Sequence, residues 1–333
     1  MSKTYNVAVV GATGAVGIEM IKTLEKRNFP VGKLTLLASA KSVGKKLKFH
    51  GADVAVQELT KDSFAGIQFA LFSAGGSISK EFAPIAVKAG CVVVDNSSFF
   101  RMDPNVPLVV PEVNGADAKN HKGIIANPNC TTAIALMALY PLHQAFGCTR
   151  IFASSYQAVS GTGAKAIAEL EKQVDQVVKG QPVTREVYPH QIAFNVLPQV
   201  DSFLPTGYTK EEMKMENEGR KIMHHPGFKA SVTCVRVPVY RAHSIAVTAE
   251  FEKPITPEAA LAVLKKAPGL DVIDNPAKSE YPLPLYQAEK YNCAVGRIRK
   301  DCALANGLSF WVSGDQLLKG AALNAVQIAE LFV

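Results

Sequence analysis

One cysteine is placed where its thiol could act as a nucleophile. Cys130 follows Asn129, a residue type that caps helix N-termini, and precedes an apolar run over residues 133–142. Cys130 is therefore expected in the first turn of a largely buried helix, where unpaired N–H groups and the helix dipole stabilise a thiolate. A buried structural thiol is the alternative, because free cysteine is among the most buried residue types. The helix-start context favours the nucleophile.

A glycine-rich turn near the N-terminus predicts a nucleotide site. Residues 7–10 predict a strand, residues 11–17 read GATGAVG, and residues 18–21 begin a helix. A strand, a glycine turn and a helix in this order are typical of a dinucleotide phosphate cradle, although a structural βα turn has the same pattern. The expected cofactor contacts in this turn are Gly11, Ala12, Thr13, Gly14, Ala15 and Val16.

The loop after the second predicted strand favours NADP over NAD. The acidic residue that would bind a ribose 2′-hydroxyl is missing there, and the loop instead contains Ser39, Lys41 and Ser42. Two hydroxyls and an ammonium group suit a 2′-phosphate, while a solvated loop with one lysine is the alternative. A second turn of small residues, which would let a cofactor approach closely, follows the strand at 69–73. It consists of Ser73, Ala74 and Gly75.

Length and composition indicate a two-domain globular protein. The chain has 333 residues, 48% hydrophobic and 20% charged, with neither a signal-peptide pattern nor a long apolar span. Six cysteines without CxxC spacing fit a reducing compartment, so a soluble cytoplasmic protein without a disulfide framework or a membrane partner is expected.

The charge pattern argues against a nucleic-acid partner. The net charge is +7, but the basic residues are dispersed, and the only tight cluster lies at 45–48. Small anionic ligands or simple solubility charge both explain the surplus. The adjacent histidines His224 and His225 cannot share a face on one element, so no metal site is expected.

The order of predicted elements indicates an α/β protein. An N-terminal domain over residues 1–130 alternates strands and helices, as in a Rossmann-like doubly wound parallel sheet. Its strands are predicted at 5–11, 33–38, 69–73, 91–95, 108–110 and 123–126, and its helices at 14–27 and 77–89.

A second, α+β domain with a mixed sheet is predicted over residues 131–313. Its long strands are expected at 151–156, 232–239 and 244–251, with a helix at 162–179. The proline-rich residues 180–210 predict an extended contact or lid segment. An apolar-faced helix over 314–333 is expected to pack back on the first domain and complete it.

Three further polar residues lie in or beside predicted strands. Gln157 ends a strand 27 residues after Cys130, and His243 lies seven positions beyond Arg236. Taken singly, His243 suits a satisfied core histidine and Arg236 could face solvent from a strand.

Eight ordered motifs together resemble the aspartate-β-semialdehyde dehydrogenase family. They are GATGAVG at 11–17, SAKS at 39–42, DNSSFFRM at 95–102, NPNCTT at 127–132, QAVSGTG at 157–163, EEMK at 211–214, VRVPVYRAH at 235–243 and GDQLLKGAALN at 314–324. The tail of the NPNCTT motif is a variant that the family accommodates. Lys41 stands where many relatives have arginine, which concerns the strength of the 2′-phosphate contact.

The resemblance implies a role for each matching residue. Cys130 would attack an aldehyde, His243 would act as acid and base, and Gln157 would orient the intermediate. The implied substrate and phosphate contacts are Arg236 and Glu211 at the amino-acid end, Arg101 with Lys214 at the phosphate, and Asn129. The further implied cofactor contacts are Ser160, Gly161, Gly163 and Gln316.

The implied reaction is the reversible, NADP-dependent interconversion of L-aspartate 4-semialdehyde plus phosphate and L-4-aspartyl phosphate, through a cysteine thiohemiacetal and an acyl thioester. Its reductive direction belongs to lysine, diaminopimelate, threonine and methionine biosynthesis. Members of the family pair through the second domain, so a homodimer is expected.

Two other functions are weighed. Other thiol-dependent acyl-phosphate reductases, of the N-acetyl-glutamyl-phosphate or glyceraldehyde-phosphate type, place a histidine where this chain has Gln157, and a glutamine cannot act as a base. A cofactor-sensing protein without catalysis would keep the fold alone. The intact set of Cys130, Gln157, Arg236 and His243 argues against it.

Overall fold

The chain folds into two units, and the computed structural model describes residues 3–333. The first unit contains the residues up to 128 together with residues 321–333, and the second contains residues 129–320. Within residues 3–333, no helix is both long and apolar enough to cross a membrane.

The first unit is built on a seven-stranded sheet with the order β3-β4-β2-β1-β5-β6-β7. Its neighbouring strands are parallel except for the antiparallel β3–β4 hairpin. Its central strands are almost continuously apolar and buried, as expected where helices cover both faces of a parallel sheet. The strands are β1 (Tyr5–Val10), β2 (Val31–Ala38), β3 (Lys46–Phe49), β4 (Ala52–Glu58), β5 (Phe69–Phe72), β6 (Val92–Asp95) and β7 (Ile124–Ala126).

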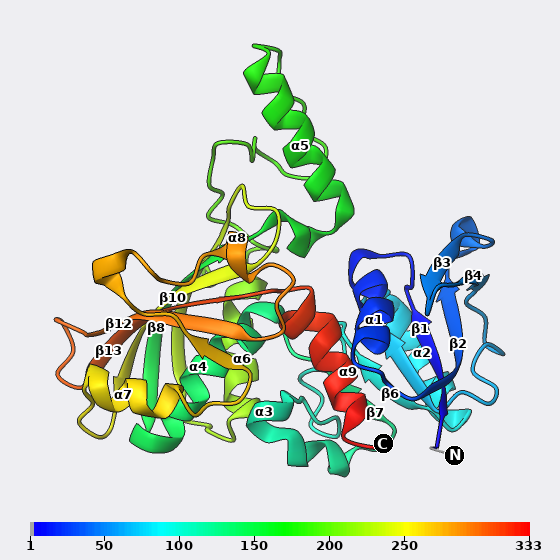
Figure 1. Ribbon diagram of the computed structural model, residues 1–333, viewed down its shortest axis with the longest axis horizontal. Helices are drawn as coiled ribbons and strands as arrows, with labels where there is room; N and C mark the ends of the chain where they lie inside the picture. The colour runs from blue at the N-terminus through cyan, green and yellow to red at the C-terminus, as the bar shows by residue number, and fades with distance from the viewer. Residues whose placement is uncertain (1–2) are drawn as a thin grey trace. The chain divides into compact units, whose positions relative to one another are not determined.

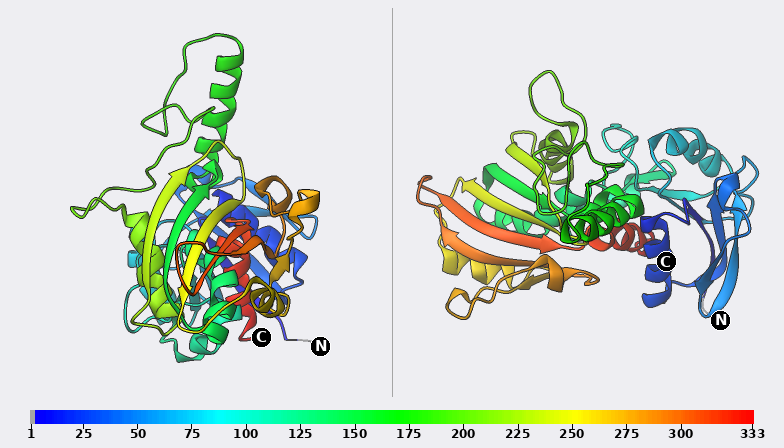
Figure 2. Two further views of the ribbon diagram at one scale, coloured as in Figure 1. Left: turned by 90° about the vertical axis from the view of Figure 1, so that its left-hand side faces the viewer. Right: turned by 90° about the horizontal axis from the view of Figure 1, so that it is seen from above.

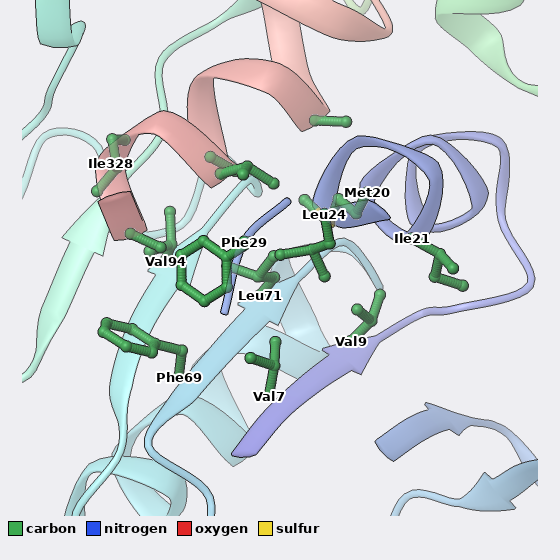
Figure 3. Packing of buried hydrophobic residues seen from close by; sticks show 14 of the residues in the cluster. Val7, Val9, Met20, Ile21, Leu24, Phe29, Phe69, Leu71, Val94 and Ile328 are labelled. Atoms are coloured by element: carbon green, nitrogen blue, oxygen red, sulfur yellow. The ribbon is translucent and has the colours of Figure 1, made fainter. Parts of the chain in front are cut away.

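The C-terminal helix α9 belongs to the core of this first unit. It packs against α1 and the β5–β6 part of the sheet, with Ile328 beside Val94 in Figure 3. An ion pair of 2.6 Å between Arg27 and Glu330 joins the ends of α1 and α9. The helices are α1 (Ala15–Lys26), α2 (Gly76–Lys88), α3 (Pro111–Asn114) and α9 (Leu323–Glu330), with 3-10 turns η1 (Ala40–Ser42) and η2 (Gly115–Asn120).

Two sequence predictions for these elements are wrong. The strand predicted at 108–110 is only an isolated bridge between Leu108 and Ala126, because Pro111 has no N–H group and begins α3 instead. The helix predicted from residue 314 begins later, since β13 extends to Gly314 and the π-helix Leu318–Ala322 then leads directly into α9.

The second unit contains a six-stranded mixed sheet with the order β11-β12-β13-β10-β8-β9. The β8–β9 and β11–β12 pairs are parallel, and the others are antiparallel. Helices α4, α6 and α7 pack together and against this sheet (Figure 1). The strands are β8 (Cys148–Gln157), β9 (Lys229–Arg236), β10 (His243–Phe251), β11 (Leu270–Val272), β12 (Cys293–Lys300) and β13 (Gly307–Gly314).

Helix α5 stands away from the sheet of its own unit, and the extended residues 181–208 return beside it, as Figure 2 shows. The helices are α4 (Cys130–Phe146), α5 (Ala164–Val178), α6 (Lys210–Ile222), α7 (Pro257–Leu264) and α8 (Pro284–Gln287), with turns η3 (Val159–Thr162), η4 (Pro276–Lys278) and η5 (Leu318–Ala322). The predicted fold class, a Rossmann-like parallel sheet followed by a mixed sheet, is confirmed.

Close backbone packing in the glycine turn generates a stability prediction. A Cβ at Gly17 would lie 2.2 Å from the Gly11 carbonyl oxygen, so Gly17→Ala should destabilise the first unit by about 1–3 kcal/mol. Thermal unfolding measures this. Gly14→Ala is the matched control, because its Cβ would lie at an ordinary 3.4 Å from the same oxygen. Equal melting temperatures for both variants would show that the close approach is not limiting.

Candidate active site

Asn129 caps the helix that begins with Cys130. Its Oδ1 accepts hydrogen bonds from the backbone N–H groups of Thr131 (3.0 Å) and Thr132 (3.2 Å). Cys130 is the first residue of α4 and is only partly buried. Its thiol therefore lies at the positive end of a helix dipole, a setting that favours the nucleophilic thiolate.

Two carboxylates of α6 hold Asn129 in place. Glu211 Oε1 accepts from the Asn129 side-chain amide at 3.0 Å, and Glu218 Oε2 accepts from its backbone N–H at 2.6 Å. Glu218 is absent from the sequence predictions. The spacing of Glu218 from Glu211 could have identified it in the sequence. Seven residues are about two helical turns, which places both side chains on one face of α6.

Glu211 joins several of the predicted site residues. Its Oε1 also accepts from Gln157 Nε2 at 3.2 Å, and its Oε2 pairs with Lys214 Nζ at 2.7 Å. Lys214 also approaches Asp201 Oδ2 at 3.4 Å. Burial alone would raise the pKa of Glu211, but Lys214, Asn129 and Gln157 outweigh burial and lower that pKa. Glu211 is therefore a buried carboxylate that stays ionised.

The parallel pairing of β8 and β9 sets Gln157 beside Arg236. The Gln157 amide is oriented from its other end, because Oε1 accepts from the Ser155 hydroxyl at 2.9 Å. Arg236 Nη1 donates to the Ala158 carbonyl at 2.9 Å, so the guanidinium group is fixed as well. The sequence left Arg236 open to a solvent-facing position, but its side chain is buried.

His243 begins β10 and is completely buried. Its Nδ1 accepts the Ala158 N–H at 3.0 Å, so the neutral ring carries its proton on Nε2. Nε2 itself has no hydrogen-bond partner in residues 3–333. Burial first, and then the positive charge of Arg236, hold the pKa of His243 well below its usual range.

Gly161 leaves room in front of these two side chains. A Cβ there would lie 2.9 Å from Arg236 Nη1 and 3.1 Å from His243 Nε2. Ser160 and Gln316 are joined by a hydrogen bond from the amide to the hydroxyl, and Gln316 Oε1 accepts the Ala242 N–H at 2.8 Å. Three of the four further cofactor contacts therefore lie near His243, and Gly163 precedes α5.

A cavity of about 560 Å³ adjoins this network, with Arg236, Glu211 and Gly161 in its lining. Residues 187–190 of the extended segment also line it. Glu169 of α5 holds that segment, because its carboxylate accepts the backbone N–H groups of Glu186 (2.7 Å) and Tyr188 (3.2 Å). The cavity thus combines a largely apolar lining with the charged side chain of Arg236, which suits a small ligand with an anionic group.

The predicted cofactor residues of the first unit form their own cluster. Gly11, at φ +85°, packs closely against the turn of small residues that begins at Ser73. A Cβ at Gly11 would lie 2.5 Å from the Ser73 carbonyl oxygen. Thr13 and Ser42 hydroxyls approach to 3.3 Å. Gly14 and Gly75 precede α1 and α2 and have no side chains to cap them, so helix N–H groups remain open to an anion. These residues fit a dinucleotide.

Arg101, predicted to bind phosphate, lies in the first unit and is buried there. Its Nε donates to the Asn127 carbonyl and its Nη2 to the Asn96 carbonyl, both at 2.9 Å. Lys214 belongs to the second unit, where it forms an ion pair with Glu211. The structure therefore describes these two cations separately.

Cys91, Cys148 and Cys234 are buried cysteines. Burial raises the pKa of Cys91 to about 11 and is the largest cause that raises those of Cys148 and Cys234 to about 12. Among residues 3–333, no cluster of three or more His, Cys, Asp or Glu side chains could hold a metal.

Comparison with known proteins identifies the family. The family models described as semialdehyde dehydrogenase NAD binding domain and dimerisation domain match residues 6–121 and 139–319. An aspartate-semialdehyde dehydrogenase of Aquifex aeolicus is 55% identical over 333 residues, which cover 99% of this chain and 98% of the relative. The chain belongs to the aspartate-semialdehyde dehydrogenase family. The predicted family and the enzyme class, an oxidoreductase, are confirmed.

Solved structures of aspartate-semialdehyde dehydrogenases have the same fold. Enzyme II of Vibrio cholerae, complexed with ASA, has a TM-score of 0.97 and 45% identity, covering 99% of this chain and 98% of that one. The enzyme of Candida albicans, solved with NADP, has a TM-score of 0.76 and 25% identity, covering 99% and 98%. The family match supports a nicotinamide cofactor for this chain.

The positive charge of Arg236 near His243 leads to a prediction about the pH at which His243 titrates. Because the positive charge of Arg236 lowers the pKa of His243, Arg236→Gln should raise the titration midpoint of His243 toward its ordinary value. Proton NMR of the imidazole, assigned with His243→Asn, measures the midpoint.

Arg220→Gln is the control, since Arg220 pairs with Glu216 on α6 at 2.8 Å. An unchanged midpoint in Arg236→Gln would show that burial alone sets the His243 pKa.

Proposed function

We propose that the chain catalyses the reversible, phosphorylating oxidation of L-aspartate 4-semialdehyde to L-4-aspartyl phosphate with NADP. The observation that carries this proposal is the connected hydrogen-bond network from Asn129 through Glu211 to Gln157, beside the first residue of α4. Its chemistry is that of an activated thiol next to an anion-binding cavity.

Arg236 is the group we assign to the substrate carboxylate. It lines the cavity, and one bond from Nη1 to the Ala158 carbonyl fixes the plane of the guanidinium group. A fixed guanidinium fork binds a carboxylate through two parallel N–H donors. Glu211, ionised in the same cavity lining, provides the negative charge that suits the substrate ammonium group.

Cys130 supplies the covalent step. The thiolate sulfur forms a bond to the aldehyde carbon, and the carbonyl electron pair moves to the oxygen, which gives a thiohemiacetal. A bound NADP would supply the oxidant for this step by taking up the hydride of the aldehyde carbon, and the acyl group would then remain on the Cys130 sulfur as a thioester. Phosphate oxygen attacks this thioester, releasing the acyl phosphate and returning the electron pair to sulfur. The reductive direction reverses these steps.

His243 and Gln157 act on the oxygen of this acyl group. We assign His243 the proton transfer through Nε2, the ring nitrogen that protein groups leave open. A carboxylate bound to Arg236 offsets the charge that helps to lower the His243 pKa, so substrate binding favours proton uptake. Gln157 uses one N–H of its amide for Glu211, and we assign the second to the acyl intermediate.

Arg101 and Lys214 are the cations that we assign to phosphate. The cofactor contacts proposed are the cluster around Gly11 and the Ser160–Gln316 pair, with Ser39, Lys41 and Ser42 at the 2′-phosphate. The NADP-containing relative from Candida albicans supports this choice.

A homodimer is the proposed assembly. The matched dimerisation domain covers the mixed sheet, and the exposed aromatic side chains Phe152 and Tyr156 both project from β8. Sedimentation of the full chain measures its mass. We place the enzyme in the cytoplasm, in the pathway to lysine, diaminopimelate, threonine and methionine.

Removal of the thiol tests the reaction. Cys130→Ser should abolish NADPH formation from aspartate semialdehyde and phosphate while NADP affinity and melting temperature stay unchanged, because a serine hydroxyl ionises far less readily than a thiol. Cys302→Ser, at an exposed cysteine, is the control and should keep full activity. Retained turnover in Cys130→Ser would exclude the mechanism, and preference for N-acetyl-glutamate semialdehyde would exclude the substrate.

The cofactor preference has its own test. NADP should exceed NAD in kcat/KM by roughly tenfold, which needs about 1.4 kcal/mol from the 2′-phosphate. Lys41→Glu should reduce kcat/KM for NADP selectively, since it places a negative charge beside that phosphate. Lys33→Glu, at the opposite end of β2, is the control. Equal values for both cofactors in the wild type would contradict the assignment.

A further inference from the structure

We infer that Asp315 is a positioning residue that fixes Cys130 and His243 relative to one another. This inference rests on the proposed thiol mechanism. Asp315 directly follows Gly314, the residue of β13 that pairs with His243 of β10. Its carboxylate is completely buried and accepts hydrogen bonds from two segments next to these side chains.

One carboxylate oxygen of Asp315 holds the turn that leads into His243. Oδ2 accepts from Arg241 Nε and from the Glu289 backbone N–H, both at 2.6 Å. Between Arg241 and His243 lies Ala242, at φ +71°, a left-handed conformation that an alanine rarely adopts. Such a conformation persists only where neighbours hold it. The Arg241–Asp315 ion pair and the Gln316 side chain hold Ala242 from both sides.

The other carboxylate oxygen holds the turn that backs Cys130. Oδ1 accepts the N–H groups of Leu317 (2.9 Å) and Leu318 (3.2 Å), and the Asp315 carbonyl accepts the Gly320 N–H at 3.2 Å. Gly320 lies directly against the nucleophile. A Cβ at Gly320 would be 2.6 Å from Cys130 Cβ and 3.0 Å from Cys130 Cα.

A single buried group thus connects the supports of both reacting side chains. If the carboxylate charge is lost, Arg241 can release the strained turn and the turn from 315 to 320 can shift. Either movement displaces His243 or Cys130. Displacements of about an ångström at reacting groups reduce turnover by up to roughly a hundredfold, without a comparable effect on substrate binding.

Asp315→Asn in the full-length enzyme tests this role, because asparagine keeps an oxygen acceptor and removes the charge. We expect kcat to fall roughly ten- to a hundredfold, with KM for aspartate semialdehyde and NADP changed by less than about threefold. kcat is expressed per reactive Cys130, counted by iodoacetamide alkylation that substrate prevents. A merely structural role would lower the count and the melting temperature but leave kcat per site unchanged.

The controls separate charge from local support. Asp301→Asn removes a carboxylate that also accepts two turn N–H groups, those of Ala303 and Leu304 at 2.9 Å, at the other end of β13. It should leave kcat unchanged. Arg241→Gln should reproduce the Asp315→Asn defect, and the double variant should lose no more than either single variant.

Three outcomes overturn the inference: an unchanged kcat per site in Asp315→Asn, additive losses in the double variant, or an equal loss in Asp301→Asn. If Asp315→Asn does not fold, Arg241→Lys keeps the charge with a different geometry and should show the same kcat defect. The rate of Cys130 alkylation does not depend on turnover. Suppose that the wild type does not turn over aspartate semialdehyde, but that Asp315→Asn still changes the rate of Cys130 alkylation. That result would contradict the proposed function and leave the positioning role of Asp315 standing.

Discussion

The cap of helix α4 is the contact on which the active site depends. Asn129 uses all of its polar groups at once: its side-chain oxygen satisfies two N–H groups of the helix, and its amide and backbone N–H groups bind Glu211 and Glu218. This arrangement fixes the first turn of α4 from outside the helix. Helix α6, in turn, is anchored by the capping box of Thr209 and Glu212, so the position of the thiol is set by contacts between α6 and the start of α4.

The network around the thiol alternates in charge. Glu211 lies between Lys214 and the amides of Asn129 and Gln157, while Arg236 lies beside neutral His243. A buried carboxylate without such donors would take up a proton, and a buried histidine beside an unpaired arginine stays neutral. The site thus keeps Glu211 as a buried anion and leaves the proton affinity of His243 dependent on whichever anion binds Arg236. Substrate binding and proton transfer are coupled through that arginine.

The sequence predicted the first unit better than the second, for physical reasons. Buried parallel strands such as β5 are short apolar runs, which are visible without an alignment. Strand β12 carries Gly296, Arg297 and Lys300, and its place in the sheet depends on pairing with β13. The site residues were found through ordered motifs. Glu218 escaped notice because its role comes from Asn129, 89 positions away, and Asp315 because its partners come from two other segments.

The first unit is built from two separate parts of the chain, residues up to 128 and residues 321–333. This affects when it can fold during synthesis on the ribosome. Residues up to 128 are made early, but Ala325, Val326 and Ile328, which belong to the same apolar core, are made only after the whole second unit. Until α9 arrives, the face of the nascent sheet around Leu71 and Val94 lacks its cover. Domains that are continuous in sequence can fold during translation, whereas this one cannot complete its core until residues 321–333 have been synthesised. The growing chain therefore has a long period of exposed hydrophobic surface, in which chaperone binding competes with aggregation.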